Sequence, residues 1–87
     1  MGKYYVENKT WYPICWQDGG WRSRDIEPGW FWTQDSDHDA NVTIICKAYG
    51  GAEEWGRVWI PLGSVLVFYG KDNWELVGYE DRRSRRE

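Results

Sequence analysis

The sequence has few of the residues that most catalytic sites require. Its 87 residues include one histidine, two cysteines and one methionine. A histidine-based nucleophilic triad would have to use His38, and no serine or cysteine stands in a recognisable nucleophile motif. Glu53 and Glu54 are adjacent, so in an extended segment they point to opposite faces and make a poor acid/base pair. We therefore expect a protein that is not an enzyme and uses no cofactor.

Long hydrophobic runs are also missing. A membrane-spanning helix needs about 18 or more consecutive apolar residues, and the sequence contains no such run. The opening MGKYYVENK lacks the apolar core of a secretory signal. We expect a cytoplasmic protein with no membrane partner. In that compartment Cys15 and Cys46 are expected to be buried thiols, with a single disulfide as the alternative.

Positive charge is scarce except at the C-terminus. Residues 1–80 carry seven Lys or Arg against twelve Asp or Glu, and residues 81–87 carry four Arg against two acids. An acidic body disfavours nucleic acid and suits a larger protein with a basic surface. We expect residues 1–80 to form one β-rich domain and residues 81–87 to be a disordered basic tail. Arg82 to Arg86 would contact nucleic acid only weakly.

Aromatic residues are abundant by contrast. The chain has eight Trp, six Tyr and two Phe, but only three Leu. Because a covered Trp buries roughly 150–250 Å², one small core is not expected to hide all eight indoles. Exposed Trp is enriched at binding hot spots. Two interpretations follow: at least two Trp form a functional surface, or Trp replaces Leu and Ile as core filler.

Short alternating runs separated by turn residues predict strands almost throughout. Asp18-Gly19-Gly20 is the strongest hairpin signal, because both glycines accept positive φ. Pro13 indicates an edge or a bulge in its strand, and residues 52–55 are long enough for one helical turn only. The expected strands are 3–7, 10–17, 21–24, 30–34, 41–49, 57–62, 64–69 and 74–79. The sequence thus predicts an all-β, small single-domain antiparallel barrel or sandwich of about six to eight short strands.

The longest regular run carries the clearest alternation. Val42, Ile44, Cys46 and Ala48 alternate with other residues along 41–49. Side chains two apart on a strand point to the same face. We expect these four residues to form one uniformly apolar face of a core strand.

Two short segments suggest one specific architecture. Trp30-Phe31-Trp32, followed later by Gly56-Arg57-Val58-Trp59-Ile60-Pro61, resembles the order of a paired-Trp strand and a Gly-x-x-x-Ile-Pro stretch in SH3-like barrels. The acidic loop pattern that SH3 domains carry upstream is missing. The resemblance implies an SH3-like barrel as one possible form of the fold and implies no function.

The aspartates of residues 35–41, Asp-Ser-Asp-His-Asp-Ala-Asn, have the alternating oxygen spacing of the first half of a calcium loop. The sixth position of such a loop needs Gly for its sharp turn, and here it is Ala40. The twelfth position needs a bidentate Glu, and here it is Cys46. A transition metal could use His38 with two aspartates, but a lone His in a polar turn is usually solvated. We expect no metal site and interpret the segment as a solvated hairpin tip.

A negative knob beside paired tryptophans is the candidate partner-binding site. Asp35, Asp37 and Asp39 would meet an Arg/Lys patch on another protein. Trp30 and Trp32 are expected on one face of the preceding strand, where they would provide desolvated anchors. The weaker candidates for the same site are Trp21 and Trp55.

The function predicted by elimination is protein binding. We expect a non-enzymatic inhibitor or immunity-type factor, of the kind found in phage counter-defence or among antitoxins, that masks a basic surface of a larger protein. The alternative is a ligand-binding module that stacks sugars or nucleobases on a Trp/Tyr platform, at about 1–3 kcal/mol per base. The acidic body weighs against bases, and the cytoplasmic expectation weighs against sugars.

Overall fold

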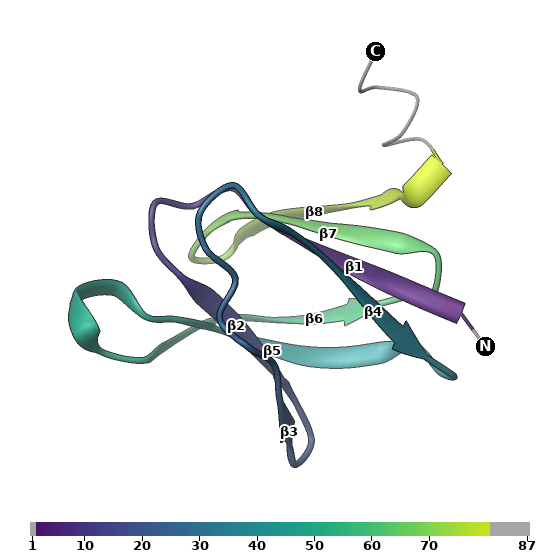
Figure 1. Ribbon diagram of the computed structural model, residues 1–87, viewed down its shortest axis with the longest axis horizontal. Coiled ribbons are helices and arrows are strands. Elements are labelled where there is room, and N and C mark those ends of the chain that lie inside the picture. Colours follow the sequence, from purple (N-terminus) through teal and green to yellow (C-terminus); the bar gives the residue numbers. More distant parts are fainter. Residues whose placement is uncertain (1, 81–87) are drawn as a thin grey trace.

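Two four-stranded sheets make up the structure (Figure 1). The computed structural model describes residues 2–80, and the expected basic tail at 81–87 lies outside the described residues. Sheet A contains, in spatial order, β4 (Phe31–Ser36), β1 (Gly2–Asn8), β7 (Ser64–Gly70) and β8 (Asn73–Gly78). Sheet B contains, in spatial order, β3 (Trp21–Arg22), β2 (Ile14–Asp18), β5 (Ala40–Cys46) and β6 (Glu53–Ile60). The predicted all-β fold is confirmed.

The core lies between the two sheets and is built by alternation along the strands. Val6 and Phe68 of sheet A pack in one cluster with Trp16, Ile44 and Ile60 of sheet B, and all five are fully buried. Two sheets that share one core in this way form a sandwich. The predicted apolar face is confirmed for the three of its residues that lie on β5, whereas Ala48 follows the end of that strand. Its members in this cluster are Val42, Ile44 and Cys46, with Ala48 packed against them.

One strand pair departs from the expected antiparallel arrangement. β1 and β7 run parallel, with Tyr5 beside Val65 and Asn8 beside Phe68, whereas the other strand pairs are antiparallel. A parallel pair needs a long crossover connection. Here the chain between β1 and β7 includes all of sheet B, so the two sheets are interleaved in sequence.

The two segments that resemble SH3-like barrels lie in different sheets. Trp32 is on β4 of sheet A, and Trp59 is on β6 of sheet B. Of the two architectures expected, barrel and sandwich, the eight strands form a two-sheet sandwich.

The predicted hairpin at Asp18-Gly19-Gly20 is confirmed. Asp18 of β2 pairs with Trp21 of β3, and Gly19 has φ of 61°. The strand before this hairpin is shorter than the expected 10–17, because β2 begins at Ile14, directly after Pro13. Pro13 has no N–H to donate to a ladder, which explains why the strand starts after it.

Residues 9–13 form a loop that is organised by a buried amide. The Asn8 side chain is fully buried, donates to the carbonyls of Tyr12 (2.8 Å) and Ile26 (2.9 Å), and accepts the Thr10 N–H (2.9 Å) and hydroxyl (2.7 Å). All the hydrogen-bonding groups of the amide are therefore satisfied, as a buried polar group requires. The same amide joins this loop to the segment that contains Ile26.

The helical turn expected at 52–55 is wrong in position. A 3-10 turn, η1 (Ala48–Gly50), lies earlier, and β6 already begins at Glu53. Pairing of Glu53 with Cys46 of β5 holds this segment extended. Among residues 2–80, no helix has the length and apolar character needed to cross a membrane.

The two cysteines are free thiols. Cys15 and Cys46 are both buried, and burial raises the pKa of each thiol above its usual value. They sit on neighbouring strands, where Ile14 pairs with Cys46 and Cys15 pairs with Ile45. Because adjacent residues of a strand point to opposite faces, the two sulfur atoms lie on opposite faces of sheet B. The expectation of buried thiols is confirmed.

Candidate functional site

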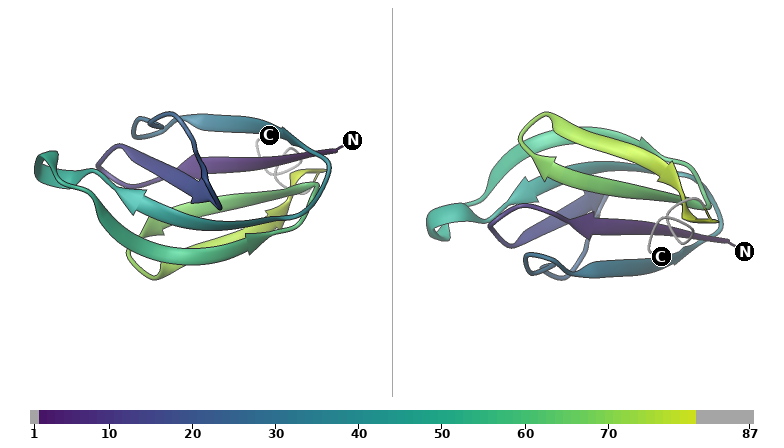
Figure 2. Two further views of the ribbon diagram at one scale, coloured as in Figure 1. Left: turned by 90° about the horizontal axis from the view of Figure 1, so that it is seen from below. Right: turned by 90° about the horizontal axis from the view of Figure 1, so that it is seen from above.

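The acidic loop, defined here as residues 35–39, joins the two sheets. β4 of sheet A ends at Ser36 and β5 of sheet B begins at Ala40, so only residues 37–39 form the connection. β4 pairs with β1, whereas β5 pairs with β2 and β6. The interpretation of this segment as a hairpin tip is therefore wrong. In both views of Figure 2 the connection lies at the same end of the sandwich as the N-terminus, opposite η1.

A serine holds the turn of the acidic loop. The Ser36 hydroxyl donates to the His38 carbonyl (2.6 Å) and accepts the His38 N–H (3.2 Å). Local hydroxyl-to-backbone bonds of this kind stabilise tight turns. The loop thus has a defined conformation on the surface.

Two of the three carboxylates of the loop bond basic side chains at the surface. Asp35 pairs with Lys3 across the β1–β4 ladder, and this bond raises the pKa of Lys3. Asp37 accepts a bond from His38 Nδ1 (2.7 Å), which lowers the pKa of Asp37 and raises that of His38. These pairs turn the carboxylates toward different partners. Within residues 2–80, no three His, Cys, Asp or Glu side chains are grouped so that they could hold a metal ion.

Asp39 instead connects the loop to β6 and to the residues that follow it. Its Oδ1 accepts the backbone N–H of Leu62 (2.9 Å), and its Oδ2 accepts the indole N–H of Trp59 (3.3 Å). A carboxylate that accepts two N–H bonds fixes both of its partners. Asp39 is therefore a structural residue of this loop as well as a source of charge.

The eight tryptophans divide into core and surface groups. Trp16 is fully buried, and Trp32, Trp55 and Trp74 are partly buried against the core. The exposed group comprises Trp11, Trp21, Trp30 and Trp59, with relative exposures of 89%, 45%, 54% and 62%. The expectation that one small core leaves some indoles exposed is confirmed.

The structure does not place Trp30 and Trp32 together on one face of a strand. β4 begins at Phe31, so Trp30 lies in the preceding turn, where its backbone N–H donates to the Glu27 carbonyl. Trp32 packs against the core, with its ring 6.2 Å from that of Trp16. The length of β4, about 3.3 Å per residue, separates Trp30 from the acidic loop by roughly 20 Å.

Trp55, one of the two weaker sequence candidates, is also partly buried against the core. Ile44 pairs with Gly56 but Ile45 pairs with Glu54, so Trp55 is the extra residue of a β-bulge. The bulge reverses the alternation at this point. The Trp55 ring packs on Tyr12 and Phe68, at centroid distances of 6.2 and 6.3 Å.

Two other exposed tryptophans flank the acidic loop. Trp59 is bonded to Asp39 as described, and Trp21 lines a surface pocket together with Asp35 and His38. Trp21 was a weak sequence candidate, and Trp59 was missed. The sequence does carry a signal for Trp59. Val58 and Ile60 are the apolar members of an alternating run, so Trp59 between them is expected to point to the opposite, outer face.

The pocket beside Trp21 combines an aromatic wall with carboxylates. It has a volume of about 360 Å³, and its other lining residues include Tyr4, Asp18, Gln34 and Ser36. The Asp18 carboxylate forms no ion pair within residues 2–80. The Trp21 ring rests edge-on against the buried Trp16, with centroids 5.8 Å apart. The pocket can therefore offer a cation both an indole held in place and a carboxylate.

Comparisons of the chain with models of protein families, with curated proteins and with solved structures found no match.

Proposed function

We propose that this protein is a cytoplasmic, non-enzymatic interaction module that binds a basic surface of a larger protein and masks it, as an inhibitor or immunity-type factor does. The observation that carries the proposal is the position of Trp21 and Trp59 on either side of the acidic loop. Exposed aromatics beside clustered carboxylates are the features that bind arginine-rich surfaces.

The pocket beside Trp21 suits an arginine side chain of the partner. A guanidinium that enters it would meet the indole of Trp21 and the carboxylate of Asp18. Cation–π contact contributes about 0.5–2 kcal/mol, and a charged hydrogen bond contributes about 1.5–3 kcal/mol. One arginine bound in this way would act as a hot spot.

Trp59 provides a second anchor at a suitable distance. Trp21 is on β3 and Trp59 is on β6, the two edge strands of sheet B. Three inter-strand spacings of about 4.8 Å separate these edges by roughly 14 Å. This span lies within an interface of standard size, which covers about 800 Å² on each partner. Because Asp18, the partner of Trp21, and Asn41, the partner of Trp59, lie on opposite faces of sheet B, one partner would contact both anchors by wrapping around this end of the sheet.

The aromatic rings on the outer face of sheet A weigh against a stacking platform there. The Tyr5 ring is stacked on Phe31 at 5.6 Å and on Tyr79 at 4.2 Å between centroids, and Tyr5 is only 9% exposed. Rings that already cover one another leave little π-surface for a sugar or a base. This arrangement favours protein binding over the alternative function.

Affinity capture from lysate of the organism that encodes the protein tests the proposal. The wild type is compared with Trp59→Ala and with Trp11→Ala as a matched control. Trp11 is more exposed than Trp59 and follows the end of β1 that is opposite to the acidic loop. We expect one stoichiometric basic protein to be captured by the wild type and by Trp11→Ala. Trp59→Ala should bind it at least about 30-fold more weakly, the effect of losing a hot spot. Equal capture by all three proteins would refute the proposed site.

A further inference from the structure

The outer face of sheet B carries a row of polar side chains that crosses all four strands. Arg22 of β3 pairs with Gln17 of β2, Gln17 pairs with Thr43 of β5, and Thr43 pairs with Arg57 of β6. Directly opposed residues on a sheet project to the same face. The row therefore has an arginine at each end and two neutral hydrogen-bonding side chains between them.

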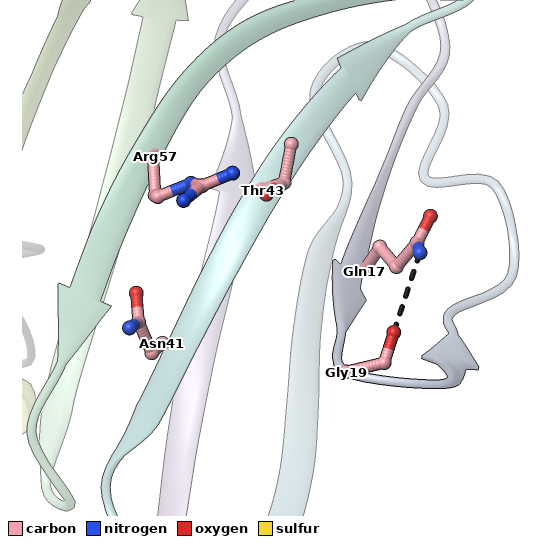
Figure 3. A pocket seen from close by; sticks show the side chains of 5 residues that line it. All are labelled: Gln17, Gly19, Asn41, Thr43 and Arg57. Carbon is pink, nitrogen blue, oxygen red and sulfur yellow. Dashed lines mark hydrogen bonds between the residues drawn. The ribbon is translucent and has the colours of Figure 1, made fainter.

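This row lines two adjoining pockets. One has a volume of about 340 Å³ and is lined by both arginines together with Gln17 and Thr43. The other, of about 300 Å³, is lined by Gln17, Gly19, Asn41, Thr43 and Arg57. In Figure 3 the Arg57 side chain extends across the face toward Thr43, and Gln17 is turned toward the Gly19 carbonyl. Volumes of this size are at the small end of the range for small-molecule sites, about 300–1,000 Å³.

The charges of the two arginines are not neutralised by neighbouring side chains. Within residues 2–80, the Arg57 side chain has no hydrogen bond or ion pair, and the Arg22 side chain bonds only the neutral amide oxygen of Gln17 (3.0 Å). Glu54 lines the larger pocket but forms no ion pair with either arginine within these residues. Two unpaired guanidinium groups on one pocket are notable in a body whose residues 1–80 are acidic overall.

We propose that this pocket binds the phosphate group of a small organic phosphate. Guanidinium groups bind phosphate through paired N–H donors, and Arg22 and Arg57 offer two such groups from opposite sides of one pocket. The Thr43 hydroxyl and the amides of Gln17 and Asn41 supply neutral donors for the remaining oxygens and for the organic part. The acidic body disfavours a long polyanion such as nucleic acid, so the ligand is a single small molecule.

The phosphate pocket shares no lining residue with the protein-binding site. Trp59 projects from the same outer face, since it pairs with Asn41, but neither pocket is lined by Trp59, Trp21 or the acidic loop. Substitution of Arg22 or Arg57 therefore tests phosphate binding without removing a residue of the protein-binding site.

Titration of 15N-labelled protein with ribose 5-phosphate at low ionic strength tests the proposal, with ribose as the uncharged control. We expect saturable shifts of the Gln17, Thr43 and Arg57 amides with ribose 5-phosphate and none with ribose. Inorganic phosphate should bind at the same amides. Arg57→Gln and Arg22→Gln should each weaken binding about tenfold.

Two further variants keep the test independent of folding. Glu54→Gln should strengthen binding by about threefold, since it removes a like charge from the pocket, and a folding defect would not produce that gain. Arg24→Gln, an exposed arginine outside both pockets, should leave binding unchanged. The proposal is overturned by an absence of saturable shifts up to millimolar ligand, or by equal affinities of the wild type and Arg57→Gln.

Discussion

The indole N–H of Trp59 donates a hydrogen bond to the Asp39 carboxylate across 3.3 Å. This bond ties the exposed tryptophan of β6 to the loop that joins the two sheets. An anchor that is already held before binding loses less side-chain entropy when a partner arrives. Trp59 and Asp39 thus place an aromatic anchor next to a negative charge, a role for which the sequence had suggested Trp30 and Trp32.

Replacing Asp39 with alanine should lower the free energy of unfolding by about 1 kcal/mol, because the Leu62 N–H and the Trp59 indole lose their acceptor. Asp39→Asn keeps an oxygen that can accept the Leu62 N–H, so it should lose clearly less. Urea denaturation measures both variants. An equal loss for the alanine and asparagine variants would show that these hydrogen bonds do not account for the role of Asp39.

Replacing Gly56 with alanine should destabilise the contact between the sheets. A Cβ at this position would lie 2.4 Å from Cζ3 of Trp74, whose ring stacks on Phe68 at 6.0 Å. Overpacking of this kind costs about 1–3 kcal/mol. Thermal unfolding measures the change, with Gly20→Ala as the control, since a Cβ at Gly20 meets nothing within 4 Å. A Gly56→Ala variant as stable as the control would contradict this packing.

Removing the buried amide of Asn8 should lower the free energy of unfolding by more than the small size of this side chain suggests. Asn8→Ala leaves the Ile26 carbonyl and the Thr10 N–H without their side-chain partner in the interior. We expect a loss of about 2 kcal/mol or more. Denaturant titration compares this variant with Asn73→Ala, which removes an exposed asparagine at the start of β8. If both variants lose the same stability, the amide network is not a determinant of the fold.

The Asp37–His38 pair should be visible as a shifted histidine titration. The hydrogen bond to Asp37 raises the pKa of His38 above its usual 6.5, and the bond to His38 lowers the pKa of Asp37 below its usual 3.8. The contribution of His38 to stability is complete below pH 6.5 and is lost as the pH rises through the raised pKa. The contribution of Asp37 is present above pH 3.8 and is lost as the pH falls through the lowered pKa.

NMR titration of the His38 ring measures this effect. The wild type should titrate above pH 6.5, and Asp37→Asn should move the midpoint down toward that value. Identical midpoints in the two proteins would show that the pair does not form in solution. Because both side chains are exposed, the effect on overall stability should be small.

Local features of the fold were predictable because they depend on neighbours in sequence. The apolar alternation of Val42, Ile44 and Cys46 places them in the core, and the two glycines after Asp18 form the hairpin turn. The assignment of strands to sheets is a property of the whole chain. Nothing local to β4 indicates that it pairs with β1 rather than with β5, so the acidic loop was interpreted as a hairpin tip.

The sequence predicted a surface that combines aspartates with exposed Trp, but it did not predict which Trp lie there. Exposed Trp next to the aspartates was expected, and Trp21 was among the candidates, but Trp30 lies at the far end of β4 and Trp32 packs on the core. The bulge that turns Trp55 inward depends on the register between β5 and β6. Register depends on how both strands bury their apolar faces and on the connection between them, which the pattern of one strand alone does not contain.

The carboxylates beside Trp21 are proposed to steer a basic partner to this end of the sandwich. The most direct measurement is the association rate constant of the captured partner across a range of ionic strength, for the wild type, Asp18→Asn/Asp35→Asn and Asp72→Asn. Asp72 lies in the turn between β7 and β8, away from the acidic loop, and has φ of 54°, which asparagine tolerates. We predict that the double variant associates about threefold to tenfold more slowly at low salt, that this difference shrinks as salt is added, and that Asp72→Asn matches the wild type. Equal rates for all three proteins at every ionic strength would show that these carboxylates do not steer the partner.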